Sequence, residues 1–447
     1  MQKLQDRLDR AIATIDLSVE ELPTFNKFKE DISQIRSSYW RIDGSSEPNP
    51  MECLTKMSSL SVDGRLVAIG STSDYDNLRI YDLDTNKTLM THLNTITLPD
   101  IHSIQWLYDP SDDNGSSSSN DDDSIRFLLT GHIDGISNLT MIPIGDNSEI
   151  RNAQIIKRFN HKKHLNNAPD NHLVANNGKP TDVIYQQAVT PRSWKTCNKN
   201  SLISIYRENV FLWDTTRSRY PILTNKVKGI SSFDANIEND GLLALTGTFG
   251  VSLFDMRSSG SDCFFIPDKL NKECTTVSWC KEDPNYLCSA DLKDQMTVWD
   301  IRNLKPLATL DAHSDSITSI QWDNLGSIYS SSNDGRIIYW DLSNLNLSAG
   351  HEECIKCTTK NSFNMDFTYN EIGTCIPVSN SSVVAMLSVG NGMTLTMDET
   401  FLGLHSKVEK SSDGDRRSSA ATLVEDASQP KYVRSRQRYS SDTLINM

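Results

Sequence analysis

Strand-like runs that end in an aromatic residue followed by aspartate recur along this chain, and their spacing limits the folds it can adopt more than any other feature. The runs read LRIYD, VFLWD, VSLFD, MTVWD and IIYWD, and they end at Asp82, Asp214, Asp255, Asp300 and Asp341. The last four ends are 41, 45 and 41 residues apart. A period of about 40–45 residues is typical of four-stranded sheets that stack around a common axis, because one such sheet cannot bury both of its faces alone.

The repeat that ends at Asp341 is the most complete. Residues 312–341 contain the segments AH, SITSIQW, GSIYSSS, NDG and IIYWD, which predict two strands, a tight Asn-Asp-Gly hairpin and a third strand. This pattern resembles a WD-repeat blade, and the resemblance covers most of residues 50–405. It implies a hydrogen-bonded set with a structural role, because a buried indole N–H needs an acceptor. The members of this set are His313, Ser330, Asp334 and Trp340.

The other repeats are degenerate, but seven candidate blades can be counted. They lie near residues 50–90, 100–146, 181–222, 228–266, 272–307, 311–347 and 350–402. We therefore predict an all-β fold, a seven-bladed WD-repeat-like β-propeller, over residues 36–405. The strand-like segment SSYWRIDG (37–44) is predicted to supply the outer strand of the last blade. Two polar stretches, near 109–124 and 159–180, are predicted to be disordered insertions.

The N-terminal 35 residues have a different pattern. Pro23 interrupts it, and Ser18 followed by Glu21 fits a capping box, so two amphipathic helices are predicted over residues 1–35. Apolar residues recur every three or four positions along one helical face: Leu4, Leu8, Ile12, Ile15, Val19, Leu22, Phe25, Phe28, Ile32 and Ile35. Periodicity does not identify what this face contacts. Two readings stay open: packing on the rim of the propeller, and association through residues 4–35 with a partner or a second copy.

The last 42 residues, 406–447, are predicted to be a disordered tail. They contain nine Ser, eight Lys or Arg and six Asp or Glu, a local net charge of +2 in a chain of net charge −14. Ser419 lies three residues after Arg416, and Ser441 lies three residues after Arg438. Kinases whose acidic pockets recognise arginine suit such sites. The tail is interpreted either as a docking element controlled by phosphorylation at Ser419 and Ser441, or as a solvated segment without that role.

Composition and charge make several function classes poor candidates. A net charge of −14 is unsuited to a protein that mainly binds phosphates, so we expect no nucleic-acid partner. Nine irregularly spaced cysteines do not form a secreted disulfide framework. The start MQKLQDRLDR has no apolar signal-peptide core, and no apolar run reaches membrane-spanning length. We therefore expect a cytoplasmic protein without a transmembrane segment.

Catalytic and metal-binding signals are weak. His351, Cys354, Cys357 and Cys375 have plausible metal spacing, but free thiols are the simpler interpretation. We find no glycine-rich phosphate loop and no nucleophile elbow. The sequence therefore predicts no enzyme activity, no cofactor and no metal.

One short motif occurs at the ends of two neighbouring repeats. The boxes FDMR and WDIR place an aspartate two residues before an arginine, as Asp255 with Arg257 and Asp300 with Arg302. They resemble boxes in the WD-repeat substrate receptors of cullin-type ubiquitin ligases, and that resemblance implies that these residues contact the ligase adaptor. The alternative is that each arginine pairs with a local carboxylate.

The main functional prediction is a non-catalytic scaffold that binds other proteins or peptides on the propeller surface. A degenerate propeller, an Asn/Ser-rich acidic insertion and an Arg/Ser tail together resemble the fungal daughter-cell-specific expression proteins. That resemblance implies a role in cell-wall metabolism and mother–daughter cell separation after division, with concentration at the bud neck. The alternative function is a substrate receptor of a cullin-type ubiquitin ligase. Fold alone does not choose between these functions.

Overall fold

The protein is described here by a computed structural model in which residues 1–409 and 410–447 are separate units. The described residues belong to the first unit and are 34–41, 57–107, 125–144, 153–165, 182–190, 201–215, 219–236, 241–257, 264–265, 272–324, 326–343, 345, 354–359, 370–377, 382–390, 393–398 and 401–408. The helices predicted over 1–35 lie outside them as far as residue 33, as do the insertion predicted near 109–124 and the tail beyond 408. No helix within the described segments has the length and apolar character needed to cross a membrane.

The described residues form β-sheets, as the repeat predicts. Three four-stranded antiparallel sheets come first along the chain. The first contains β2 (Met57–Asp63), β3 (Leu66–Ser71), β4 (Leu78–Asp84) and β5 (Leu89–Ile96). The second contains β6 (Ser103–Trp106), β7 (Ile125–Gly131), β8 (Ile136–Pro143) and β9 (Gln154–Asn160), followed by the short 3₁₀ helix η3 (Lys162–His164). The third contains β10 (Gln187–Thr190), β11 (Ser201–Tyr206), β12 (Asn209–Asp214) and β13 (Leu223–Lys226).

The remaining strands form two more four-stranded sheets and one nine-stranded sheet. One four-stranded sheet contains β14 (Ile230–Ala235), β15 (Leu242–Gly247), β16 (Gly250–Asp255) and β17 (Phe264–Phe265). The other contains β27 (Ala385–Gly390), β28 (Met393–Met397), β29 (Phe401–Val408) and β1 (Gln34–Arg41). The nine-stranded sheet contains β18 (Cys274–Trp279), β19 (Tyr286–Asp291), β20 (Gln295–Asp300), β21 (Lys305–Asp311), β22 (Ile317–Asn324), β23 (Ser327–Ser332), β24 (Arg336–Asp341), β25 (Ile355–Thr359) and β26 (Asn370–Pro377).

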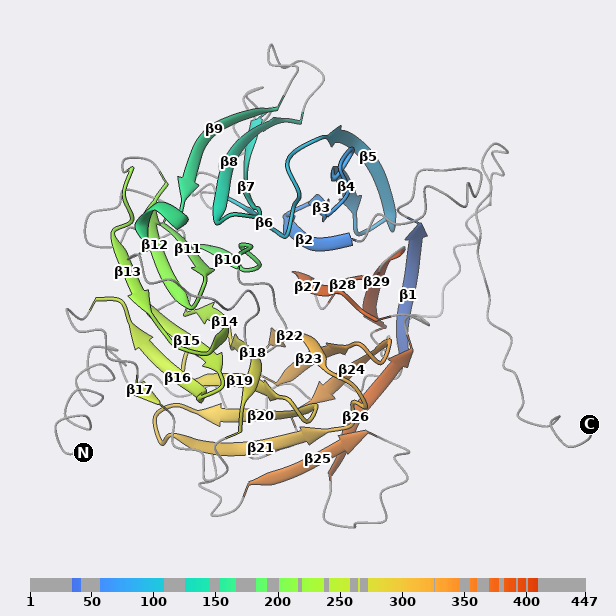
Figure 1. The fold of residues 1–447 in the computed structure, drawn as a ribbon. Helices are drawn as coiled ribbons and strands as arrows, with labels where there is room; N and C mark the ends of the chain where they lie inside the picture. The colour runs from blue at the N-terminus through green and yellow to red at the C-terminus, as the bar shows by residue number, and fades with distance from the viewer. Residues whose placement is uncertain are drawn as a thin grey trace, which may run out of the picture. The chain divides into compact units, whose positions relative to one another are not determined.

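The sheets are arranged around a common centre like the blades of a propeller (Figure 1). The strands nearest the centre contact one another in the order β2, β6, β10, β14, β18, β22 and β27, and β27 contacts β2. Apolar clusters fill the spaces between neighbouring sheets, so the middle strands are buried on both faces. This explains why runs such as VFLW are continuously apolar instead of alternating.

Hydrogen bonds from inner strands tie neighbouring sheets together. Serine hydroxyls donate to backbone carbonyls of the next sheet in four places: Ser58 to Ile101, Ser103 to Ile184, Ser231 to Cys274 and Ser319 to Met386. At Gly131 the backbone comes so close that a Cβ would lie 2.3 Å from the Ser103 Oγ and 2.6 Å from the Ile184 carbonyl oxygen. Only glycine leaves room for this bond at that position.

The N-terminal strand closes the arrangement. The strand predicted over 37–44 is confirmed for residues 37–41, which belong to β1, and residues 42–44 lie outside the described residues. β1 pairs antiparallel with β29 from Gln34–Val408 to Arg41–Phe401. Trp40 packs against an apolar cluster that β2–β4 share with β28 and β29. Because β1 precedes the first sheet and completes the last one, this pairing joins the two ends of the propeller. The predicted helical extension is therefore wrong for residues 34 and 35, whose backbone pairs with β29.

The predicted blade boundaries are wrong near the C-terminus. The segment 350–402 was assigned to one blade, but β26 pairs with β24 of the preceding repeat. The short strand β25 runs parallel to both β21 and β26 and lies between them, so the repeats near 272–307 and 311–347 form one nine-stranded sheet. The expected seven separate blades therefore remain a prediction, because hydrogen bonding separates five four-stranded sheets from this larger one.

Candidate functional sites

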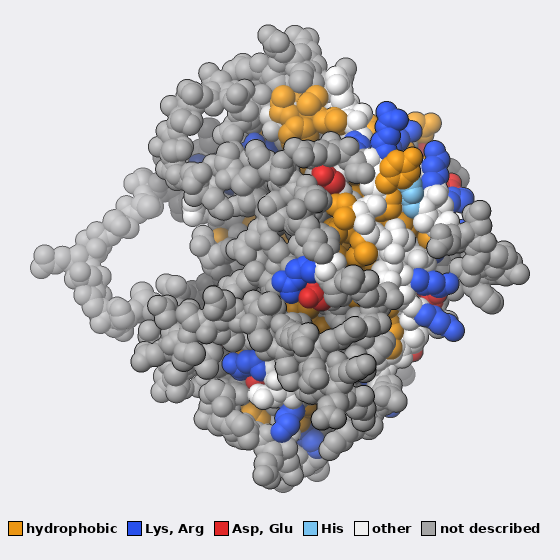
Figure 2. Space-filling model, turned by 90° about the vertical axis from the view of Figure 1, so that its left-hand side faces the viewer, with side chains coloured by type: hydrophobic (Ala, Val, Ile, Leu, Met, Phe, Trp, Pro, Cys, Tyr) orange, Lys and Arg blue, Asp and Glu red, His pale blue; other side chains and the backbone are white. Residues whose placement is uncertain are grey.

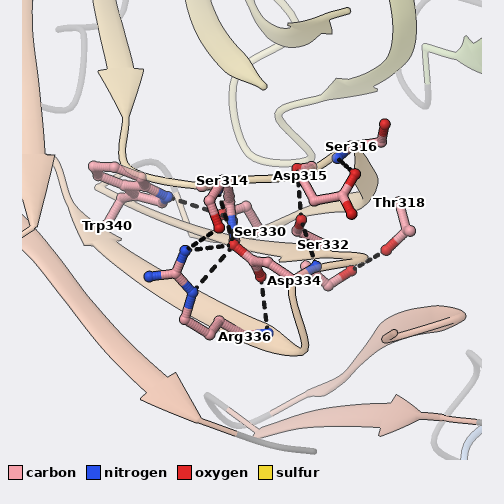
Figure 3. Close-up of polar contacts among 11 residues, drawn as sticks. Ser314, Asp315, Ser316, Thr318, Ser330, Ser332, Asp334, Arg336 and Trp340 are labelled. Carbon is pink, nitrogen blue, oxygen red and sulfur yellow. Dashed lines mark hydrogen bonds and ion pairs between the residues drawn. The ribbon is translucent and has the colours of Figure 1, made fainter. Parts of the chain in front are cut away.

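The four residues that the sequence groups in one repeat form a continuous chain of hydrogen bonds. Figure 3 shows three of them, Trp340, Ser330 and Asp334. The Trp340 Nε1–H donates to the Ser330 Oγ at 2.9 Å. The Ser330 hydroxyl lies 2.8 Å from the His313 Nε2, and the His313 Nδ1 lies 3.1 Å from the Asp334 Oδ2. A carboxylate only accepts, so the His313 Nδ1–H donates to Asp334. The structure therefore brings all four residues together in a chain that runs from β24 through β23 to the loop before β22.

Asp334 is also held by partners that the sequence did not identify. Burial opposes ionisation of this carboxyl, but hydrogen bonds from His313, the Ser314 N–H and Arg336 outweigh it and hold the pKa of Asp334 well below its usual range. The Arg336 Nη2 lies 2.7 Å from the Asp334 Oδ2. The sequence feature that could have indicated this contact is the position of Arg336, two residues after the turn aspartate Asp334. The carboxylate is thus fully committed to internal bonds, which suits a structural role and not proton transfer to a substrate.

A second chain of the same kind contains His161, which was assigned to the insertion predicted over 159–180. The His161 Nε2 lies 2.7 Å from the Ser204 Oγ and accepts from the Trp213 Nε1–H at 2.9 Å. Its Nδ1–H donates to the Gly135 carbonyl oxygen at 2.9 Å, so a backbone group takes the place of the aspartate. Complete burial lowers the pKa of His161 to about 3, so the ring is neutral at physiological pH.

The predicted insertion is therefore wrong at its start. Residues 159 and 160 end β9, and residues 161–165 turn through η3 back onto the third sheet. The segment NHKKH (160–164) is polar, so its composition does not indicate that His161 is buried. A long connection also separates His161 from its partners Ser204 and Trp213. The pair Ser204 and Trp213, with the spacing of Ser330 and Trp340 to within one residue, was the available signal.

Other repeats keep only part of this chain. The Trp299 Nε1–H donates to the Ser289 Oγ at 2.9 Å, and the Lys272 Nζ lies 3.2 Å from the Asp291 Oδ2 of the same sheet. In the last sheet, the His405 Nε2 lies 2.9 Å from the Thr396 Oγ1. Burial lowers the pKa of His405 to about 4. The buried members of these pairs, Trp299, Ser289, Thr396 and His405, therefore hold neighbouring strands together inside the protein.

Asp234 is a buried carboxyl that sequence reasoning missed. It lies on β14, and its Oδ2 accepts from the Trp279 backbone N–H of β18 at 2.7 Å. Its Oδ1 accepts from the Ala235 N–H at 2.9 Å. Burial raises the pKa of Asp234 to about 6, because the backbone donors only partly offset the loss of solvent. This residue links two neighbouring sheets.

The two Asp-x-Arg boxes adopt the same geometry at the ends of β16 and β20. The Arg257 Nε and Nη2 lie 2.9 and 3.0 Å from the two carboxylate oxygens of Asp255. The Arg302 Nε and Nη2 both lie 3.0 Å from the carboxylate oxygens of Asp300, and the same Nη2 lies 2.9 Å from the Tyr286 hydroxyl. Each arginine therefore folds back onto its own aspartate, and its side chain is 29% exposed at Arg257 and 26% exposed at Arg302.

The remaining candidate residues are dispersed or lie outside the described segments. Cys354 and Cys357 are on or next to β25, Cys375 is exposed on β26, and His351 is not among the described residues. In the described part of the chain, no group of three or more His, Cys, Asp or Glu side chains is placed to hold a metal ion. Burial raises the pKa of the Cys357 thiol to about 12, so it stays protonated. Ser419 and Ser441 lie beyond the described residues.

Comparison with known proteins gives consistent matches across yeasts. A family model described as the DSE1 N-terminal domain matches residues 51–412. Protein DSE1 of Debaryomyces hansenii is 32% identical over 412 residues, covering 84% of this chain and 58% of the relative. Protein DSE1 of Saccharomyces cerevisiae is 29% identical over 341 residues, covering 70% of this chain and 56% of the relative. This chain thus matches less than two thirds of the length of these relatives.

Two solved structures are similar in fold. A chain in a structure titled Crystal Structure of Mitotic Checkpoint Complex has a TM-score of 0.53 at 15% identity and covers 88% of this chain and 98% of its own. The WD40 beta propeller domain of Doa1 has a TM-score of 0.50 at 13% identity and covers 79% of this chain and 93% of its own. At such low identity these matches show the propeller fold alone.

Proposed function

The chain belongs to the family of the DSE1 N-terminal domain, and from this premise we propose that it is a non-catalytic scaffold that binds other proteins through the surface of a WD-repeat propeller. The observation that carries this proposal is that polar side chains of the described sheets bond to one another inside the protein. His313, Ser330, Asp334 and Trp340 in one chain, and His161, Ser204 and Trp213 in another, are bonded to one another inside the protein. What such a fold offers to other molecules is its loops and rim.

We propose that the propeller has seven blades, with the nine-stranded sheet counted as two. The antiparallel sets β18–β21 and β22–β24 with β26 each contain four strands, and β25 connects their outer strands. An apolar cluster that includes Cys288, Val298, Ile320 and Trp340 packs between the two sets, as between other neighbouring sheets. The closed order of inner-strand contacts supports the same count.

The family suggests where the scaffold acts. We propose a role in cell-wall metabolism and mother–daughter cell separation, with the protein concentrated at the bud neck. The support is the family match and the resemblance of the overall organisation to daughter-cell-specific expression proteins. The partners and activity of the longer relatives are part of this proposal, because this chain matches just over half of their length.

A second candidate, a substrate receptor of a cullin-type ubiquitin ligase, rests on the matched geometry of Arg257 and Arg302. Each arginine lies two residues after the end of its strand, β16 or β20, and makes the same two-point contact with the aspartate that ends the strand. The same contact also fits the simpler explanation, in which each arginine only stabilises its own turn. We therefore rank this function second.

Affinity purification of the tagged full-length chain from dividing yeast cells separates the two functions. Recovery of septation, polarity or cell-wall proteins supports the scaffold role in cell separation. Recovery of a cullin adaptor that is lost in the double variant Arg257→Ala, Arg302→Ala supports the ligase role. Recovery of no specific protein by a folded, tagged chain contradicts both functions.

A further inference from the structure

The outer strands of the second and third sheets carry a concentration of positive charge that the proposed function leaves unexplained. The described residues 153–165 and 219–229, which contain β9, η3 and β13, include seven Lys or Arg and no Asp or Glu. The whole chain, in contrast, has a net charge of −14. Acidic groups from elsewhere meet this surface in two places: the Lys162 Nζ lies 3.0 Å from the Asp134 Oδ1, and the Glu208 Oε1 accepts from the Gly229 N–H at 2.9 Å, next to Lys228. We call this surface the basic edge and define it by Lys162, Lys163, Tyr220, Ile222, Lys226 and Lys228.

The two halves of the basic edge are in direct contact. The His164 ring on η3 lies edge-on to Tyr220 at 5.5 Å and to Trp213 at 5.4 Å, measured between ring centroids. The Lys157 Nζ on β9 donates to the backbone carbonyl oxygen of Asp214 at 2.9 Å. On the side of the molecule that carries β9 and β13, exposed apolar, basic and histidine side chains lie close together in the upper right of Figure 2, where acidic side chains are few.

The edge strand β13 presents these groups at the spacing of an extended chain. Ile222, Thr224, Lys226 and Lys228 are exposed at alternate positions, whereas Asn225 and Val227 between them are buried. Side chains at alternate positions of a strand lie about 6.6–6.8 Å apart on one face. An extended peptide that pairs with or runs beside β13 would present its own alternate side chains at the same interval. β13 is the last strand of its sheet, and no other strand among the described residues pairs with its outer side.

Lysines on an edge strand have a simpler explanation, because they prevent edge-to-edge aggregation. That explanation does not account for the apolar side chains beside them. Tyr220 is 69% exposed and Ile222 is 38% exposed, and exposed apolar groups favour the aggregation that the lysines oppose. A mixed surface of this kind suits a ligand that carries both negative charge and apolar side chains.

We propose that the basic edge binds an extended acidic segment of a partner protein, laid along the outer side of β13. Acidic side chains of that segment lie against Lys226 and Lys228, and an apolar side chain lies against Ile222 and Tyr220. This is the strand-addition mode of peptide recognition, in which alternate side chains give specificity. The inference rests on the proposed scaffold function and names the chemistry of one partner.

An anionic membrane surface is the competing ligand for a basic surface with apolar groups. The alternation along β13 favours the peptide, because a bilayer has no repeat of that length. Two partly exposed apolar side chains also offer little area for insertion, on which binding at a membrane interface depends. The membrane is therefore treated as an outcome of the test that would overturn the proposal.

The probe for this test is a labelled octapeptide whose four alternate positions carry tyrosine, threonine, glutamate and glutamate, with serine between them, so that one face opposes Ile222, Thr224, Lys226 and Lys228. A second peptide carries the same residues in the reverse order, and binding of each to the full-length protein is measured by fluorescence anisotropy. The expected result is saturable binding that weakens about tenfold or more in the double variant Lys226→Glu, Lys228→Glu, since two attractions become repulsions. The matched control Lys87→Glu, Lys305→Glu makes the same charge change at the ends of other outer strands, and it keeps its affinity. A second variant, Ile222→Asp, also weakens binding but changes one residue only.

Three results would overturn the proposal. The first is no peptide binding, and the second is an equal loss of binding in the control variant, which would indicate general attraction to a charged protein. The third is binding to vesicles of phosphatidylserine and phosphatidylcholine in place of the peptide, abolished by the Lys226 and Lys228 changes. If the wild-type chain recovers partners from cells and the Lys226→Glu, Lys228→Glu variant recovers all of them equally, this inference fails while the scaffold function stands. If the wild-type chain recovers no partner, the scaffold function itself fails.

Discussion

Replacing Trp340 with alanine tests whether the polar chain of the most complete repeat is structural. The Trp340 side chain is fully buried in the apolar cluster between β18–β21 and β22–β24. Truncation of a buried tryptophan costs about 3–5 kcal/mol. The change also removes the donor to the Ser330 Oγ at 2.9 Å, and a lost hydrogen bond of this kind costs about 1 kcal/mol. The expected total is about 4–6 kcal/mol, a large part of the about 5–15 kcal/mol that holds a typical domain folded.

Urea unfolding followed by circular dichroism measures this loss, and two variants serve as controls. Trp340→Phe keeps most of the apolar contact but removes the N–H, so it is expected to cost about 1–3 kcal/mol. Trp299→Ala removes an equally placed indole that donates to Ser289 at 2.9 Å, and it is expected to cost about as much as Trp340→Ala. A Trp340→Ala protein that unfolds like wild type and has lost one binding partner would refute the structural reasoning, since it would make Trp340 a contact residue.

Three further predictions concern the boxes, the buried histidine and the tail. The double variant Arg257→Ala, Arg302→Ala is expected to lower the free energy of unfolding by about 0–1 kcal/mol for each Asp–Arg pair removed. It is also expected to recover the same partner proteins as wild type in affinity purification. Loss of a cullin adaptor alone would favour the ligase function. Because burial lowers the pKa of His161 to about 3 in the folded protein against 6.5 in the unfolded chain, its contribution is fully present above pH 6.5 and is lost as the pH falls. At about pH 5 the loss is about 2 kcal/mol, so His161→Gln is expected to have a smaller difference in unfolding free energy between pH 7 and pH 5 than wild type; an equal difference would contradict the buried neutral ring. Mass spectrometry of protein from dividing cells is expected to find phosphate on Ser419 and Ser441, and each phosphate adds about −1.5 to −2 charges. Unchanged localisation and unchanged partners in the variant with alanine at both positions would exclude control of docking by phosphorylation.

The sequence identified the elements that repeat with a fixed period and missed those that depend on chain segments far apart. The hairpin at Asp334 and the hydrogen-bonded set around Trp340 were recognisable because turn, strands and partners lie within one repeat. The closure strand β1 was also recognisable, because the last repeat lacked an outer strand. Its partner β29 lies more than 350 residues away, so only that deficit in the repeat indicated the pairing.

His161 and β26 show why the rest was not predictable. A connection of about forty residues separates His161 from Ser204 and Trp213, and composition within this connection is that of a polar loop. The pairing of β26 with β24 likewise crosses a long segment, so the chain order suggested that β26 began a new blade. In both cases the deciding interaction is tertiary, and local pattern carries no information on it. The basic edge was missed for the same reason, since β9 and β13 belong to different repeats.

Hydrogen exchange of the full-length chain tests the closed propeller most directly, and the other conclusions depend on that closure. Peptides covering β1 and β29 are to be followed by mass spectrometry together with peptides from β27 and β28. If Gln34–Arg41 pairs with Phe401–Val408 along its whole length, the amides of β29 and the alternate amides of β1 that face β29 exchange as slowly as the paired amides of β27 and β28, through the same cooperative opening. Exchange of residues 34–41 at the rate of an unfolded peptide, with β27–β29 still protected, would contradict a ring closed by the N-terminal strand.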